Sequence, residues 1–138
     1  MIRLFLDANV LFTAAHNPEG KAALVVAVAG ANGPWELVTS GLAEAEARRN
    51  LSRKYPAALE RLEEVLRGVR RVSPPPPHEC PVPLEEKDRP ILHAAIVAQA
   101  SHLLTGDLKH FGPHMNRPEQ TGGITIQTVG SFLEAWLR

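Results

Sequence analysis

Short apolar runs alternate with segments of helical periodicity along the chain, and this alternation constrains the fold more than any other feature. The first run, Ile2–Leu6, is apolar except for Arg3, which suits a strand buried in a parallel sheet. Strands are expected over residues 2–6, 35–38, 69–72, 103–104 and 124–126. Strands separated by helices form right-handed crossovers, so the sequence predicts an α/β fold with a mostly parallel sheet covered on both faces.

The segments between these strands carry helix-end residues. Thr39 or Ser40 can cap a helix that runs through Leu51, and Pro56 can open the next one. Further helices are expected from about residue 9, over residues 22–29, from residue 88 and over residues 129–137. The prolines at 74–77 predict a stiff polyproline II connector, with partner docking as the alternative. Helices are therefore expected between successive strands up to residues 103–104.

The composition is that of a folded protein of one domain, residues 1–138. Apolar residues make up 44% of the 138 positions and charged residues 22%, which allows an ordinary hydrophobic core. The longest apolar run, residues 22–29, is too short to cross a bilayer, so no membrane association is expected. The single cysteine, Cys80, fits a reducing compartment, and we expect a cytoplasmic protein.

The formal net charge is zero, from 15 basic and 15 acidic residues. A global positive field, which marks many nucleic-acid-binding proteins, is therefore missing. RNA binding would depend on a local basic rim around an acidic pocket, since such a rim can contact phosphates while the remaining surface cancels the charge.

Carboxylates follow two of the expected strands directly. Asp7 comes directly after residues 2–6, and Asp107 follows residues 103–104 after two intervening residues. Asp88 opens a helix. Each of them alone also suits a turn or a helix cap. Together at one sheet edge they would repel one another by about 1 to 4 kcal/mol per close pair, unless a cation were bound. Hard oxygen ligands favour Mg²⁺ or Mn²⁺.

Four segments in order along the chain resemble PIN-domain nucleases, including the VapC-type toxins of toxin–antitoxin pairs. They are Leu6-Asp7-Ala8-Asn9-Val10-Leu11, Glu46-Ala47-Arg48-Arg49-Asn50-Leu51, Asp88 with Ile91-Leu92-His93-Ala94-Ala95, and Leu103-Leu104-Thr105-Gly106-Asp107. The resemblance implies a three-layer α/β/α sandwich with a sheet of about five strands. It also implies a metal-dependent endoribonuclease that hydrolyses RNA phosphodiester bonds by attack of a metal-activated water.

The resemblance assigns the catalytic and metal-binding roles to four acids, Asp7, Glu46, Asp88 and Asp107. Asn9 and Thr105 match supporting positions that would orient a carboxylate or a bound water. The implied cofactor is Mg²⁺ or Mn²⁺, bound as one or two ions. A small antitoxin protein and a second copy of the chain are the partners that the family suggests.

Glu46 competes with Glu44 for its place, because two residues that are two positions apart on a helix point in very different directions. The apolar phase of Ala43, Ala47 and Leu51 does not choose between them. Glu46 is preferred because the residues that follow it match the family, which leaves Glu44 to pair with Arg48 one helical turn later.

The basic rim that RNA binding requires is expected at Arg49, Lys109 and His110, although basic residues on a helix are more often simply solvated. Two other functions fit the pattern less well. A haloacid-dehalogenase-type phosphatase also has an Asp after its first strand, but its second Asp would fall where this chain has Asn9. A PIN-like domain that only binds proteins would have no use for the acids, which destabilise the fold when they are close together.

Overall fold

The computed structural model describes residues 1–30, 32–75 and 79–138, and a parallel sheet of five strands lies at its centre. The strands are β1 (Ile2–Leu6), β2 (Trp35–Ser40), β3 (Val69–Val72), β4 (His102–Leu104) and β5 (Thr125–Gln127). Their order across the sheet is β3-β2-β1-β4-β5, and every neighbouring pair is parallel. This confirms the predicted parallel sheet, although β2 extends two residues further than expected, β4 begins one residue earlier and β5 is shifted by one residue.

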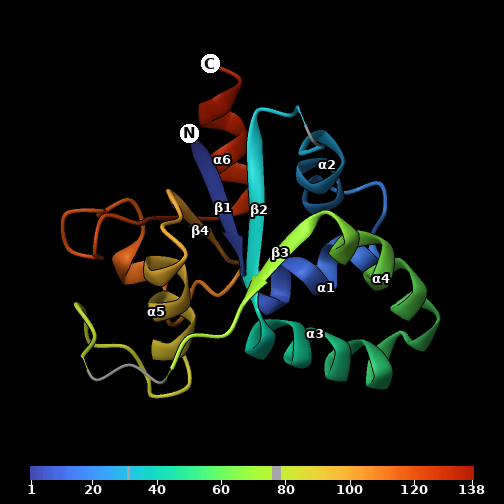
Figure 1. Cartoon of the computed structure of the whole chain (residues 1–138), viewed down its shortest axis with the longest axis horizontal. Coiled ribbons are helices and arrows are strands. Elements are labelled where there is room, and N and C mark those ends of the chain that lie inside the picture. Colours follow the sequence, from blue (N-terminus) through green and yellow to red (C-terminus); the bar gives the residue numbers. More distant parts are fainter. Residues whose placement is uncertain (31, 76–78) are drawn as a thin grey trace.

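Helices cover both faces of the sheet (Figure 1). The first four are α1 (Ala8–His16), α2 (Lys21–Val28), α3 (Gly41–Lys54) and α4 (Leu59–Arg67), and they lie together on one side. Helix α5 (Arg89–Val97) lies on the other side, and the last helix, α6 (Val129–Trp136), contacts α2. Two short 3-10 helices span Pro56–Ala58 and Gly112–His114. The three-layer α/β/α arrangement is therefore confirmed.

The helix ends follow from local chemistry. Ser40 caps α3, since its hydroxyl accepts a hydrogen bond from the Ala43 N–H at 3.1 Å, while the Thr39 hydroxyl donates to the Leu6 carbonyl at 2.6 Å. Of the two predicted caps, Ser40 is therefore correct. Pro56 opens a 3-10 turn that precedes α4.

The core is centred on the middle strands, whose large side chains Phe5, Leu6, Leu103 and Leu104 are fully buried. Among the described residues, no helix combines the length and the apolar character that a membrane crossing requires. The expectation of a polyproline connector falls partly on residues 76–78, which lie outside the described residues.

The order of the strands reverses direction between β1 and β4. From β1 the chain adds β2 and β3 on one side, and then crosses to place β4 and β5 on the other side. A crevice forms at such a reversal, beyond the carboxyl ends of the two central strands. The Asp7 N–H donates to the Leu104 carbonyl at 3.1 Å, so β1 and β4 stay side by side to this edge. Residues that follow the two strands are thereby brought together.

Candidate active site

A cleft of about 690 Å³ opens at this edge of the sheet. Its lining includes the four predicted acids, Asp7, Glu46, Asp88 and Asp107, which come from four different parts of the fold. Asp7 follows β1, Glu46 lies on α3, Asp88 precedes α5 and Asp107 follows β4. The fold therefore brings together carboxylates that are as far apart in the sequence as Asp7 and Asp107.

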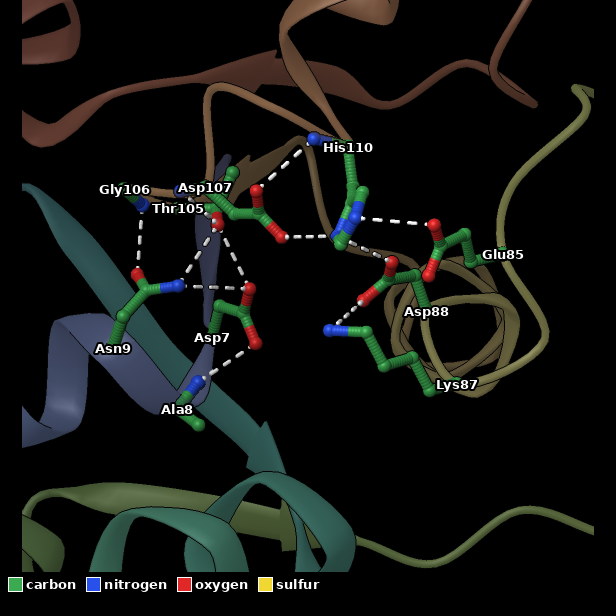
Figure 2. A network of polar contacts seen from close by, with 10 residues as sticks. All are labelled: Asp7, Ala8, Asn9, Glu85, Lys87, Asp88, Thr105, Gly106, Asp107 and His110. Carbon is green, nitrogen blue, oxygen red and sulfur yellow. Dashed lines mark hydrogen bonds and ion pairs between the residues drawn. The ribbon is translucent and has the colours of Figure 1, made fainter. Parts of the chain in front are cut away.

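Asp7 is held in place from two directions (Figure 2). It is the N-cap of α1, and its Oδ1 accepts a hydrogen bond from the Ala8 N–H at 2.7 Å. Its Oδ2 accepts from the Thr105 hydroxyl at 2.8 Å. The residue is only 5% exposed, so its orientation is fixed by these donors.

Asn9 and Thr105 tie the two central strands together at the edge of the cleft. The Asn9 side-chain amide lies 3.3 Å from both Asp7 Oδ2 and Thr105 Oγ1, and its Oδ1 accepts from the Gly106 N–H at 2.7 Å. Thr105 Oγ1 also accepts from the Asp107 N–H at 3.1 Å. Both residues therefore contact the acids, and their supporting role in the reaction stays a prediction.

Asp107 is held by His110, one helical turn further along. Its Oδ1 accepts from the His110 N–H at 3.0 Å, and its Oδ2 lies 3.0 Å from His110 Nδ1. The imidazole also reaches Glu85, whose Oε1 lies 3.3 Å from Nε2. His110 therefore lies among the carboxylates (Figure 2).

Asp88 occupies the N-cap position of α5, but its side chain does not cap the helix. The carboxylate is buried and points toward the cleft (Figure 2). Its Oδ2 lies 3.1 Å from His110 Nδ1, which also lies 3.0 Å from Asp107 Oδ2, and Asp88 Oδ2 forms no hydrogen bond with any described residue. A buried carboxylate oxygen without a donor is unfavourable, so Asp88 is not explained as a structural cap.

The two glutamates of α3 face different surroundings. Glu44 pairs with Arg48 at 2.7 Å and with Arg71 at 3.1 Å, and Arg48 also pairs with Glu63. Glu46 instead lines the cleft, and its charge acts on Asp7. The geometry thus supports the choice of Glu46, whose catalytic role stays a prediction.

Burial and neighbouring charges shift the pKa values of three of the cleft carboxyls. Burial raises the pKa of Asp7 above its usual value against the hydrogen bonds from Thr105 and Ala8, and the charges of Glu46 and Asp88 raise it further. Burial also raises the pKa of Asp88, against the opposing charges of Lys87 and His110. Burial acts in the same direction on Asp107, but the bonds and charge of His110 bring the pKa of this carboxyl below its usual value.

Replacement of Asp88 with Asn should therefore stabilise the metal-free protein at neutral pH. A carboxyl whose pKa is raised on folding destabilises the folded state when the pH rises above its folded-state pKa, because its charged form is disfavoured there. Asn carries no charge, so it removes this destabilisation. We expect the Tm in EDTA to rise by about 2 °C or more, as about 1 kcal/mol would produce. The gain should vanish near pH 3, where Asp88 is protonated in the wild type, and the exposed substitution Glu60→Gln should give no such gain. A lower Tm for Asp88→Asn in EDTA would contradict this account.

Of the basic residues predicted at the rim, Arg49 lines the cleft and is exposed, and Lys109 is exposed two positions after Asp107. His110 is turned toward the acids, and RNA contacts by all three stay predictions.

Sequence reasoning missed Glu85, which together with Asp88 and His110 presents ligand atoms close enough to hold one cation. Its position three residues before Asp88 was the only indication in the sequence.

A parallel α/β sheet with a carboxylate-lined cleft at its topological reversal defines the class of this protein. The family model described as "PIN domain" matches residues 3–109. The chain belongs to the PIN domain family, whose members are nucleases. A search of curated protein sequences finds no match.

Two solved structures show the same fold. One is VapBC-1 from nontypeable Haemophilus influenzae, with a TM-score of 0.59 and 18% identity over 94% of this chain and 99% of that chain. The other is VapBC2 from Rickettsia felis, solved bound to a DNA fragment from the promoter of the VapBC2 proteins. Its TM-score is 0.63, with 14% identity over 92% of this chain and 98% of that chain.

Proposed function

We propose that the protein is a metal-dependent endoribonuclease that hydrolyses phosphodiester bonds of RNA. The observation that carries this proposal is the convergence of Asp7, Glu46, Asp88 and Asp107 on one cleft at the reversal of strand order. Carboxylates that serve no purpose at such a place would only destabilise the fold. Membership of a nuclease family supports hydrolysis of a phosphodiester as the reaction.

The residues of the cleft fit a divalent cation. Asp88 Oδ2 is buried and accepts no hydrogen bond from the described residues, and Asp7 has a raised pKa because of burial and the neighbouring carboxylates. Both conditions are relieved by a positive charge. Oxygen-only ligands suit Mg²⁺ or Mn²⁺, and Asp7, Glu46, Asp88 and Asp107 are the residues that would hold such an ion.

In this proposal the residues of the chain position the reacting groups. The donors on Asp7 and Asp107 hold both carboxylates in place, and the bonds and charge of His110 favour the charged form of Asp107, whose pKa lies below its usual value. A water attacks the phosphorus as the bond to the leaving oxygen breaks, and a cleft carboxylate accepts a proton from this water. A bound divalent cation would supply the charge that stabilises the phosphate and activates the water. Arg49 and Lys87, both exposed at the cleft, would attract the phosphate backbone.

The test is cleavage of single-stranded RNA by the purified protein in Mn²⁺, followed by gel electrophoresis. Cleavage should stop when EDTA is added and in the Asp107→Asn protein, which keeps the side-chain size but loses a charge. A chromogenic phosphate monoester should stay intact, since turnover of it would favour the phosphatase alternative. RNA cleavage that continues undiminished in EDTA would contradict the proposal. Structured RNAs such as tRNA belong in the substrate panel.

Mg²⁺ or Mn²⁺ should raise the thermal stability of the wild-type protein. A ligand that binds only the folded state at 100 times its Kd stabilises that state by about 2.7 kcal/mol, which corresponds to roughly 8 °C for a domain of this size. Differential scanning fluorimetry with increasing metal measures this shift. The same ion added to the Asp88→Asn protein serves as the comparison, and an equal shift there would place the ion elsewhere.

The VapBC structures also support a partner for this chain. We propose that a small antitoxin protein binds it and that the nuclease acts as the toxin of the pair, in keeping with the family resemblance. A homodimer is the proposed assembly. Co-expression with the protein encoded by a short adjoining reading frame, followed by size-exclusion chromatography, tests both proposals.

A further inference from the structure

Three rings from two helices gather on the surface beside the cleft. Phe12 and His16 lie one turn apart on α1, and Tyr55 follows the last residue of α3. The His16 and Tyr55 rings are stacked, with centroids 3.7 Å apart and planes inclined by 16°, and the Phe12 centroid lies 5.8 Å from that of Tyr55. His16 and Tyr55 are exposed, whereas Phe12 is half-buried. We call these three residues the ring cluster.

The ring cluster is continuous with the acidic cleft. Phe12 lines the cleft together with Asn9, which lies one turn earlier on the same helix. Helices α1 and α3 lie beside each other (Figure 1), and residues of both line the cleft. A ligand that leaves the acids along α1 therefore meets Phe12 and then the stacked pair. From Asn9 to His16 the rise along α1 is about 10 Å.

Positive charge accompanies the rings along the same path. Arg49 and Lys54 line the cleft on α3, and the Lys54 ammonium lies 5.9 Å from the centre of the Phe12 ring. Arg53 is exposed on the preceding position of α3. Exposed aromatic residues next to cations are the combination that binds single-stranded nucleic acid, because bases stack on the rings while the phosphates pair with the charges.

We propose that the ring cluster is a stacking platform for single-stranded RNA, which holds nucleotides adjacent to the phosphodiester in the cleft. The inference rests on the proposed ribonuclease function and assigns the substrate a direction of exit, along α1 and the end of α3. A purely apolar partner would gain little from the cations, whereas RNA uses both the rings and the charges. Stacking is tolerant of base identity, so the platform supplies affinity and the cleft supplies the reaction.

The experiment measures binding apart from hydrolysis. Fluorescence anisotropy of a labelled oligouridylate is recorded with the Asp107→Asn protein in Mg²⁺, so that the RNA stays intact. Adding Tyr55→Ala should weaken binding at least about fivefold, as the loss of one stacked base does, whereas Tyr55→Phe, which keeps the ring, should bind as before. Lys54→Ala should lower the slope of log affinity against log salt by about 0.7, whereas Arg138→Ala, at the other end of the molecule, should not change it.

A second measurement identifies the contact directly. Oligouridylate that carries 5-iodouridine is irradiated in complex with the Asp107→Asn protein, and the cross-linked peptide is sequenced by mass spectrometry. A cross-link at Phe12, His16 or Tyr55 is the expected result. Equal affinity of Tyr55→Ala and its parent overturns the inference, and so does a failure to bind this RNA. If the wild-type protein did not cleave RNA but binding still depended on Tyr55, the nuclease proposal would be contradicted and the stacking platform would be supported.

Discussion

Replacement of Asp7 with Asn should reduce RNA cleavage by about 100- to 1000-fold, the size of effect seen when a single preorganised electrostatic group is removed from an active site. Asp7 is the most buried of the four acids, and three donors are directed at its carboxylate. Asn can still accept from the Ala8 N–H, so the cap of α1 survives while the charge is lost. Single-turnover cleavage of labelled RNA in Mn²⁺ measures the rate.

The same variant should respond much less to metal in a thermal melt. If Asp7 contributes to cation binding, Asp7→Asn should lose most of the stabilisation by Mn²⁺, and circular dichroism should show that the fold is kept. The control is Glu36→Gln, an acid on β2 that pairs with Arg3 away from the cleft. Full cleavage together with a full metal response in Asp7→Asn would exclude Asp7 from the site.

The two glutamates of α3 provide the second large effect. Glu46→Gln should lower cleavage by at least about 100-fold, because a charge is removed from the lining of the cleft. Glu44→Gln should leave the cleavage rate nearly unchanged. It should lower the free energy of unfolding by no more than about 1 kcal/mol, since Glu44 forms partly exposed ion pairs with Arg48 and Arg71.

This pair is a matched comparison, since both substitutions remove one charge and keep the size of the side chain on the same helix. Cleavage kinetics and urea unfolding measured on both variants separate catalysis from stability. If Glu44→Gln abolished cleavage and Glu46→Gln did not, the assignment of the fourth acid would be reversed.

Much of the fold could be predicted because local and long-range preferences agree. Ile2–Leu6 forms a buried strand as its apolar run predicts, and Ser40 caps α3 because a hydroxyl at this position satisfies a free N–H. The position of Asp7 and Asp107 at one sheet edge followed from parallel strands, whose carboxyl ends meet. The choice of Glu46 over Glu44 required the family resemblance, since the apolar phase of α3 allowed both.

Other features depend on contacts between distant residues and could not be predicted. His110 was expected at a basic rim, but a turn after Asp107 directs its imidazole between Asp107, Asp88 and Glu85. The ring cluster was missed for the same reason, because Tyr55 reaches Phe12 only when α1 and α3 pack side by side. The spacing of Phe12 and His16 by four positions was the only local indication.

The hydrogen bond from the Asp7 N–H to the Leu104 carbonyl has a consequence for folding during synthesis on the ribosome. One half of the cleft is synthesised together with β1, and the other half follows β4, which is separated from β1 by two strands and five α-helices. Contacts between such distant segments form late and slowly in folding. A nascent chain that ends before residue 107 cannot assemble the cleft, so a nuclease of this design would be inactive at least until that residue has been synthesised.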